Sequence, residues 1–262
     1  MEVMARVFVT GSAGGLGLLA ARRLVEQGHA VTLHARNAGR ASDARAEVPD
    51  AEAVVVGDLA GVAEMCAVAD QVDALGRYDA VIHNAAVGYR EPRRLTTPDG
   101  LAHVFAINVL APYVLTALIE RPARLVYLSS GMQRGGSSDL TDAQWERRRW
   151  NGSQAYSDSK LFDTMLAFAV ARHWPKVLAS SVDPGWVPTK MGGVAAPDDL
   201  DAAPTTQVWL AVSEDAGATV SGEHYYHQRP NRTHPDVHDV ARQDALLAYC
   251  AARSGISLPS LA

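Results

Sequence analysis

The stretch VFVTGSAGGLG, residues 7–17, joins a short apolar run to a segment with helical spacing. Gly11, Gly15 and Gly17 have the spacing G-x-x-x-G-x-G, and Gly14 adds a further glycine. Glycine permits a tight turn, and a phosphate can approach the backbone where no Cβ intervenes. The following helix offers unpaired N–H groups and a partial positive charge to such an anion. A plain glycine-rich turn is the alternative, but the position between strand and helix favours a nucleotide-binding loop.

The composition is that of an ordinary globular domain. The 262 residues are 48% hydrophobic and 20% charged, with a formal net charge of −5, which argues against a nucleic-acid or anionic-membrane partner. Cys66 and Cys250 are the only cysteines and stand far apart, which favours a reduced intracellular protein without a metal site. The amino terminus lacks signal-peptide features, and no apolar stretch is long enough to span a bilayer. We therefore expect a cytoplasmic protein.

Short apolar runs alternate with longer segments of helical spacing along the whole chain. The runs lack polar alternation, as expected for strands that are covered on both faces. We expect strands at 6–10, 30–35, 53–58, 79–85, 124–129, 177–183 and 223–227, and helices at 16–27, 61–75, 100–120, 154–174 and 204–214. The alternation predicts a single α/β domain over 1–262, a doubly wound parallel sheet of Rossmann type with about seven strands and helices on both faces.

Two long stretches, 131–153 and 184–204, interrupt this alternation. Both follow predicted strands, and open α/β sheets bind ligands at the carboxyl ends of their strands. We expect these excursions to form the walls of a substrate site, because long loops at such positions are usually functional. The expected substrate contacts are Met132, Trp145, Trp150 and Trp186, with Leu140 as a further apolar member of the first excursion. The alternative for the tryptophans at 145 and 150 is that they fix the loop to the sheet.

The end of the second predicted strand bears on the choice of nucleotide. A carboxylate there would accept hydrogen bonds from an adenosine ribose and repel a 2′-phosphate. This chain has Ala35 and Arg36 instead, and a guanidinium can pair with a phosphate. The sequence therefore predicts NADP(H) in preference to NAD(H), against the alternative of an ordinary exposed arginine.

Tyr156 and Lys160 stand four residues apart in a predicted helix and therefore share a face. Lys160 is one of only three lysines in the chain. A phenol is a reluctant acid at neutral pH, and a neighbouring ammonium lowers its pKa by favouring the phenolate. Such a pair can exchange a proton with the oxygen of a carbonyl that receives a hydride. The alternative is a solvated pair on a helix surface.

Further motifs follow in a fixed order, and the whole series resembles the short-chain dehydrogenase/reductase family in its single-domain branch, from Arg6 to about His227. The motifs are GDL at 57–59, HNAA at 83–86, Asn108, LSSG at 128–131, YSDSK at 156–160 and DPGWVPT at 183–189. The long gap between Ser130 and Tyr156 is similar to that of the retinol-dehydrogenase-like members. HNAA departs mildly from the Asn-Asn-Ala-Gly of the family at its first and last residues.

The resemblance implies a catalytic group and a cofactor site. The catalytic group is Asn108, Ser130, Tyr156 and Lys160, with Ser129 as the alternative serine. The implied cofactor-binding residues are Gly11, Ser12, Gly15, Leu16, Gly17, Arg36, Asp58, Leu59, Asn84, Ala85, Ala86, Tyr156, Lys160, Pro184, Gly185, Val187 and Thr189. In the family pattern, the aspartate at 58 binds the adenine amino group, and the asparagine at 108 anchors a water near the lysine.

These observations predict an NADP(H)-dependent oxidoreductase that transfers a hydride between the nicotinamide and a carbonyl or secondary alcohol, with Tyr156 as general acid/base. We expect a small-molecule substrate and either a monomer or a homo-oligomer. A non-catalytic NADP(H)-binding redox sensor or scaffold is the main alternative, although such relatives typically lose the tyrosine or the lysine. A sugar-nucleotide epimerase of the same superfamily would have the glycine spacing G-x-x-G-x-x-G and a larger C-terminal domain.

Overall fold

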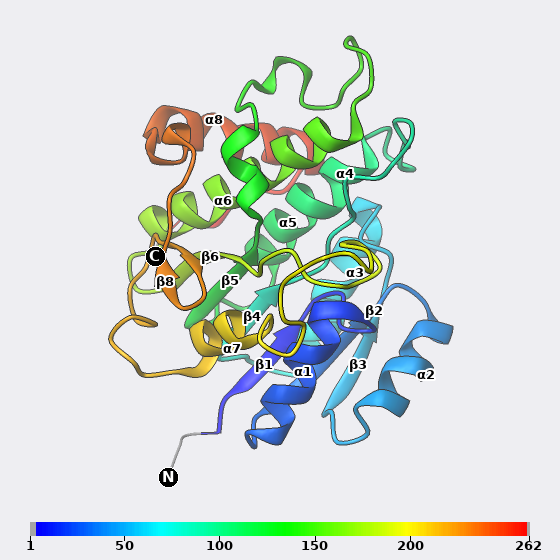
Figure 1. Ribbon diagram of the computed structural model, residues 1–262, viewed down its shortest axis with the longest axis vertical. Helices are drawn as coiled ribbons and strands as arrows, with labels where there is room; N and C mark the ends of the chain where they lie inside the picture. The colour runs from blue at the N-terminus through cyan, green and yellow to red at the C-terminus, as the bar shows by residue number, and fades with distance from the viewer. Residues whose placement is uncertain (1–3, 261–262) are drawn as a thin grey trace.

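A single eight-stranded sheet forms the centre of the protein in the computed structural model, which describes residues 4–260 (Figure 1). Its spatial order is β3-β2-β1-β4-β5-β6-β7-β8. The strands are β1 (Arg6–Val9), β2 (Ala30–Ala35), β3 (Ala53–Val56), β4 (Ala80–His83), β5 (Arg124–Leu128), β6 (Leu178–Asp183), β7 (His224–Tyr226) and β8 (Arg229–Pro230). The first seven pair in parallel, and β8 pairs antiparallel with β7. The predicted doubly wound fold is confirmed, with one short antiparallel edge strand added.

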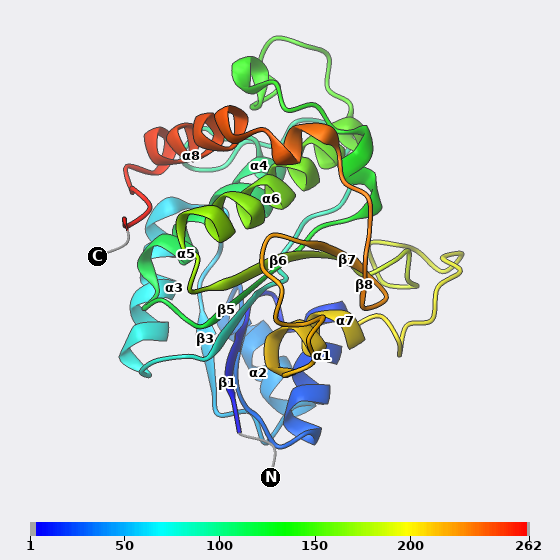
Figure 2. The ribbon, with the colours of Figure 1, turned by 90° about the vertical axis from the view of Figure 1, so that its left-hand side faces the viewer.

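Helices cover both faces of the sheet, as Figure 2 shows from the side. On one face lie α1 (Gly15–Glu26), α2 (Ala38–Glu47) and α7 (Thr205–Val212). On the other lie α3 (Val62–Ala74), α4 (His103–Phe105), α5 (Ala111–Leu118) and α6 (Gly152–His173), with α8 (Val240–Ser254) packed on the outside of α6. The sequence analysis did not predict α2 or α8. Because Ala44 is the one buried residue of α2, that helix has almost no apolar periodicity to detect.

The strands contribute side chains to two separate hydrophobic cores, because both faces of the sheet are covered by helices. In β1, Val7 and Val9 belong to the core that includes residues of α1 and α7, whereas Phe8 belongs to the core with α3, α5 and α6. All three side chains are completely buried. Successive residues of a strand point to opposite faces, so a strand between two helical layers needs apolar residues at every position.

The helix predicted at 100–120 is interrupted by a π-helix, Ala106–Leu110, between α4 and α5. Asn108 lies in this π-helix with its side chain buried. The helix is therefore locally widened around Asn108. Wider turns of this kind are rare and occur frequently at functional sites.

The turn between β1 and α1 brings the chain against the end of β4. Gly11 has a positive φ of 63°, and a Cβ on it would lie 2.8 Å from the Cα of Ala85. A Cβ on Gly17 would lie 2.3 Å from the amide nitrogen of Asn84, closer than real Cβ contacts allow. The side chain of Asn84 donates to the carbonyl of Thr10 at 2.9 Å. Gly11 is therefore required by the close approach of two backbones, and Gly17 by the side chain of Asn84.

We expect Gly17→Ala to lower the stability of the protein by about 1–3 kcal/mol, because the new methyl group must displace Asn84. The measurement is thermal or denaturant unfolding, compared with Gly135→Ala. A Cβ on Gly135 meets nothing within 4 Å and its φ is not positive, so this control should change stability by less than about 0.5 kcal/mol. Equal stability of the two variants would contradict the packing argument.

Candidate active site

A pocket of about 670 Å³ opens at the carboxyl ends of β5 and β6. Residues from seven parts of the chain meet in it: the first turn of α1, the loop after β4, the loop after β5, α6, the segment after β6, β7 and the segment after β8. The predicted site residues that line it are Leu16, Ser130, Met132, Tyr156, Pro184, Gly185, Trp186, Val187 and Thr189. It is also lined by residues that were not among the predicted site residues, namely Tyr89, Arg134, Asp183, Met191, Asp198, Tyr226 and Asn231.

The phenol of Tyr156 is buried in this pocket, which the hydroxyl-bearing side chain of Ser130 also lines. Burial raises the pKa of Tyr156, and the hydroxyl of Ser130 opposes that shift. Ser130 also caps the short 3-10 helix Gly131–Gly135, because its Oγ accepts a hydrogen bond from the backbone N–H of Met132 at 3.2 Å. The preceding serine, Ser129, instead donates its hydroxyl to the carbonyl of Lys160 at 2.9 Å. Ser130 is therefore the serine that faces the phenol.

The ammonium of Lys160 has partners other than the phenol of Tyr156. Its Nζ donates to the carbonyl of Leu128, and it lies 3.6 Å from a carboxylate oxygen of Asp163 and 5.9 Å from the ring centre of Tyr156. The expectation that this ammonium lowers the pKa of the phenol is wrong for this structure, in which that pKa is raised. Burial of the phenol dominates, and the ammonium is turned toward a carboxylate that offsets its charge.

Asn108 joins the π-helix to the turn of α6 that carries the tyrosine. Its Oδ1 accepts from the N–H of Val87 at 2.8 Å, and its Nδ2 donates to the carbonyl of Val87 at 3.1 Å and to the hydroxyl of Ser159 at 3.0 Å. That hydroxyl donates in turn to the carbonyl of Tyr156 at 2.7 Å. The side chain thus holds α6 against the π-helix, which is the arrangement of a satisfied polar residue inside a helix.

The glycine turn fits the pyrophosphate of a dinucleotide. No side chain caps the amino end of α1, and a Cβ added to Gly15 would meet nothing within 4 Å, so the space over the turn is open. A helix of this length that presents its N–H groups to open space attracts an anion. Leu16, directly after this turn, lines the pocket that holds Tyr156.

Two predicted cofactor residues serve the protein's own structure. The hydroxyl of Ser12 is completely buried, donates to the carbonyl of Val9 at 2.9 Å and accepts from the N–H of His34 at 2.8 Å, so it links the turn to β2. Leu59 is buried in the core beside α3. Asp58 next to it is exposed, and one of its oxygens accepts from the N–H of Ala60 at 3.1 Å.

The remaining predicted cofactor residues lie around the same turn. Asn84, Ala85 and Ala86 follow β4 and are half-buried, and the N–H of Ala85 donates to the hydroxyl of Thr10 at 2.9 Å. Arg36 follows β2 directly and is exposed, and its guanidinium has no hydrogen-bond or ion-pair partner among residues 4–260. These positions surround the turn on the sides of β2 and β4.

Two further side chains support the turn, and neither was among the predicted site residues. The Nδ1 of His34 accepts from the N–H of Gly11 at 2.9 Å, so its Nε2 carries the proton that is donated to the carbonyl of Gly57 at 2.9 Å. Burial lowers the pKa of His34, which keeps this neutral form. Arg40 contacts the carbonyl of Ala13 and pairs with Asp43 at 2.9 Å. Only the tertiary structure brings these residues to the turn.

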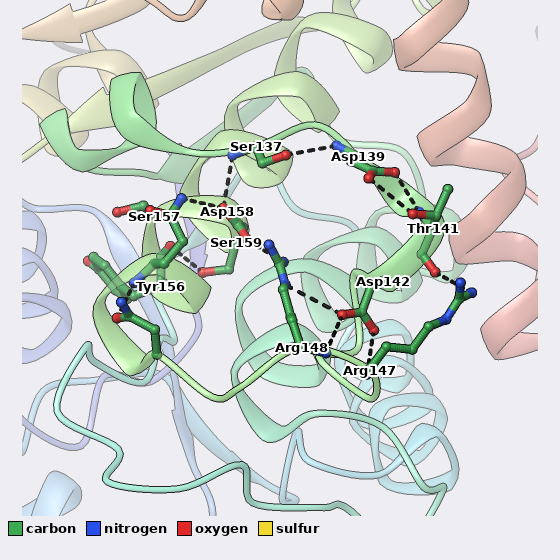
Figure 3. Close-up of polar contacts among 12 residues, drawn as sticks. Ser137, Asp139, Thr141, Asp142, Arg147, Arg148, Tyr156, Ser157, Asp158 and Ser159 are labelled. Carbon is green, nitrogen blue, oxygen red and sulfur yellow. Dashed lines mark hydrogen bonds and ion pairs between the residues drawn. The ribbon is translucent and has the colours of Figure 1, made fainter.

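The excursion 131–153 is held together by its own polar contacts and by α6 (Figure 3). Asp142 accepts hydrogen bonds from the N–H groups of Arg147 at 3.1 Å and Arg148 at 3.2 Å. Arg148 pairs with Asp158 of α6 at 2.8 Å, and the same carboxylate accepts from the N–H of Ser137 at 2.8 Å. The loop is therefore fixed to the helix that carries the tyrosine.

Trp145 and Trp150 do not line the pocket, which corrects the expected substrate contacts. Trp145 is buried in a small cluster with Val104 and Ala155, and the Trp150 ring meets it edge-on at 5.5 Å. The indole N–H of Trp150 donates to the carbonyl of Glu91 at 2.8 Å. Their apolar surface attaches the loop to α4 and α6, and not to the sheet as the alternative expectation stated. Leu140 packs against the main core, so Met132 is the apolar residue of this excursion that reaches the pocket.

The first excursion is also bonded to the segment that follows β8. Gln133 is completely buried, and its side chain donates to the carbonyl of Arg232 at 3.1 Å and accepts from the N–H of His234 at 2.9 Å. This contact places Tyr226 and Asn231 at the edge of the pocket.

The second excursion closes the pocket from the other side. Trp186 is 52% exposed, its indole N–H donates to the carbonyl of Gly192 at 3.0 Å, and its backbone N–H donates to Asp198 at 2.6 Å. Figure 2 shows this segment, drawn in yellow, standing out from the body of the protein beside β7 and β8. Within residues 4–260 no cluster of three or more potential metal ligands is found, and none of the helices is long and apolar enough to cross a bilayer.

Comparison with known proteins assigns the family. The profile of the short chain dehydrogenase family matches residues 5–199. An uncharacterized oxidoreductase of Emericella nidulans is 44% identical over 260 residues, which cover 98% of this chain and 99% of that protein. A candidate daunorubicin C-13 ketoreductase of Streptomyces sp. is 33% identical, over 85% of this chain and 83% of that protein. A crystal structure of an uncharacterized protein from Mycobacterium paratuberculosis superposes with a TM-score of 0.83 at 24% identity, covering 97% and 95% of the two chains.

The chain belongs to the short-chain dehydrogenase/reductase family. It is therefore an oxidoreductase of a family that binds a nicotinamide cofactor.

We expect Trp145→Ala to lower stability by about 3–5 kcal/mol, because it empties a buried aromatic position. The ratio of kcat/KM for a large and a small carbonyl should stay unchanged, since the ring is outside the pocket. Met132→Ala should change that ratio and alter the melting temperature little. A shift in the ratio for Trp145→Ala as large as that for Met132→Ala would restore tryptophan 145 to the substrate site.

Proposed function

We propose that this protein is an NADP(H)-dependent reductase of carbonyl compounds, acting in the reverse direction on secondary alcohols. The observation that supports this most directly is that Ser130 and Tyr156 line one pocket together with Leu16, at the start of α1, and Val187 of the segment after β6. One pocket thus joins a proton-exchanging pair to the two segments expected around a nicotinamide.

The proposed chemistry divides the work between two hydroxyl groups. The bound nicotinamide supplies the hydride in reduction and accepts it in oxidation. Ser130 holds the substrate oxygen, and Tyr156 donates a proton to that oxygen as negative charge develops on it. Burial raises the pKa of Tyr156, so the phenol holds its proton at neutral pH, which is the form that reduction requires.

The preference for NADP(H) rests on Arg36. Its guanidinium is exposed beside the end of β2 and has no partner within residues 4–260, whereas the neighbouring Arg40 is engaged with Ala13 and Asp43. A guanidinium in this position suits a phosphate on the adenosine ribose, which a carboxylate there would repel.

The substrate class follows from the pocket walls. Tyr89, Met132, Trp186 and Met191 supply aromatic and thioether surface, and the ring of Tyr89 stands edge-on to that of Tyr156 at 5.7 Å. Such walls suit a ketone with a bulky apolar or aromatic body. The relative named as a ketoreductase supports a ketone substrate. A redox sensor without turnover is the competing function, and retention of both Tyr156 and Lys160 speaks against it.

We expect Tyr156→Phe to lower kcat by at least ~10²-fold and to leave NADPH binding within about twofold, since one hydroxyl in the proton path is removed. Steady-state assays on a panel of ketones and a fluorescence titration with NADPH measure the two effects. Tyr113→Phe is the matched control, because the hydroxyl of Tyr113 donates to the carbonyl of Ile256 outside the pocket. Near wild-type turnover in Tyr156→Phe would place the chemistry elsewhere.

We expect the wild-type protein to bind NADPH at least tenfold more tightly than NADH, since an arginine–phosphate contact contributes about 1.5–3 kcal/mol. Arg36→Asp should abolish or invert that preference, as measured by the two dissociation constants. Arg77→Asp makes the same change of charge at an exposed position before β4. This position is at the amino ends of the strands, opposite to Arg36, and the replacement should leave the preference for NADPH intact. Equal wild-type affinity for the two cofactors would refute the assignment.

A further inference from the structure

One turn after Lys160, α6 carries a carboxylate that the chemistry above does not use. Asp163 is 1% exposed, and neither of its carboxylate oxygens has a hydrogen-bond partner within residues 4–260. Its one ion-pair partner is the ammonium of Lys160, at 3.6 Å, and that side chain is itself buried. A buried carboxylate without hydrogen bonds is costly, so its position beside this lysine needs an explanation.

Few ionisable groups face this carboxylate. On its own helix these are Lys160 and Tyr156, and on β5, packed beneath, it is Tyr127. The hydroxyl of Tyr127 contacts that of Thr116 at 2.8 Å, and its ring lies 4.8 Å from the ring of His83. Burial raises the pKa of Tyr127 and lowers the pKa of His83 to about 3, so both groups are neutral at physiological pH. The charge at this place is therefore decided by the aspartate and the lysine.

The two charges act on each other and on the phenol. Burial raises the pKa of Asp163 to about 7, and the ammonium of Lys160 opposes that shift. Burial lowers the pKa of Lys160, and the carboxylate opposes that shift in turn. The phenol of Tyr156 is faced by the carboxylate of Asp183, which lines the pocket, and by that of Asp163, and both act to raise its pKa, because a nearby negative charge disfavours a phenolate. A negative charge at position 163 thus makes both members of the Tyr156–Lys160 pair hold their protons more firmly.

We propose that Asp163 is a positioning residue that sets the proton affinity of the Tyr156–Lys160 pair. Its carboxylate holds the ammonium of Lys160 against the carbonyl of Leu128 and offsets the positive charge that would otherwise promote ionisation of the phenol. The phenol is thereby kept protonated, which is the form that donates a proton to a carbonyl as it is reduced. The inference rests on the proposed function, in which Tyr156 is the general acid.

The first test is the pH dependence of alcohol oxidation, which requires the phenolate. Asp163→Asn removes the charge and keeps the shape of the side chain. We expect both limbs of the bell-shaped kcat/KM profile to move to lower pH by about one unit, because protons leave the phenol and the ammonium more easily without the carboxylate. Asp163→Ser is a second, smaller neutral variant in case the amide disturbs folding. Asp163→Glu retains the charge and should return the profile toward that of the wild type.

Asp158→Asn is the matched control. Asp158 is a buried carboxylate on the same helix, but its partners are Arg148 and the N–H of Ser137 in the excursion 131–153. Its replacement should lower the melting temperature and leave both limbs of the profile in place. If the role of Asp163 were only structural, Asp163→Asn would likewise lower the melting temperature and leave both limbs of the profile in place. Unmoved limbs in the neutral variants at 163 would therefore overturn the proposal.

The second test needs no turnover. The ionisation of Tyr156 is followed by phenolate absorbance in the unliganded protein, as the difference between each variant and the same variant with Tyr156→Phe. We expect the transition to lie at lower pH in Asp163→Asn than in the wild type. If no carbonyl or alcohol is turned over by the wild type, the proposed function fails while this titration still decides the role of Asp163. A transition at the wild-type pH would refute that role by itself.

Discussion

The contact between the amide of Asn84 and the turn after β1 is the constraint on which the rest of the site depends. That amide donates to the carbonyl of Thr10, and it leaves no room for a Cβ on Gly17. The contact holds the ends of β1 and β4 together, and these two strands are neighbours in the sheet although β2 and β3 intervene in the chain. The chain changes direction across the sheet at this point, which is where open α/β sheets form their binding crevice.

Helix α6 provides the ionisable side chains of that crevice. All of its residues from Ala155 to Val170 are buried, because the sheet lies on one side and α8 and the excursion 131–153 lie on others. Polar side chains in this part of the helix are therefore removed from water. Burial, rather than a close ammonium, therefore dominates the properties of Tyr156, and the charges of Lys160 and Asp163 act on each other in a region of low polarity.

The parts of the site that the sequence predicted are those coded by local spacing. Gly11 and Gly17 stand at a strand–helix junction, and Tyr156 and Lys160 are one helical turn apart, so short-range geometry was enough. Tertiary contacts decided the rest. Trp145 looks like a substrate contact until its packing against Val104 is known. The lysine was expected to lower the pKa of the phenol because the sequence did not show which carboxylate would lie beside it. Helix α2 was missed because its buried face consists of one alanine.

The bond between Gln133 and the segment after β8 has a consequence for how such a protein can diversify. The groups assigned to proton exchange are on α6 and at the end of β5, inside the rigid body of the fold. Other surfaces of the pocket, among them those of Met132 and Asn231, are on the excursion 131–153 and the segment after β8, which are bonded to one another through Gln133. Replacements in these segments can alter which molecules enter while the inherited reaction is preserved. New specificities can thus arise along a lineage without passing through an inactive ancestor.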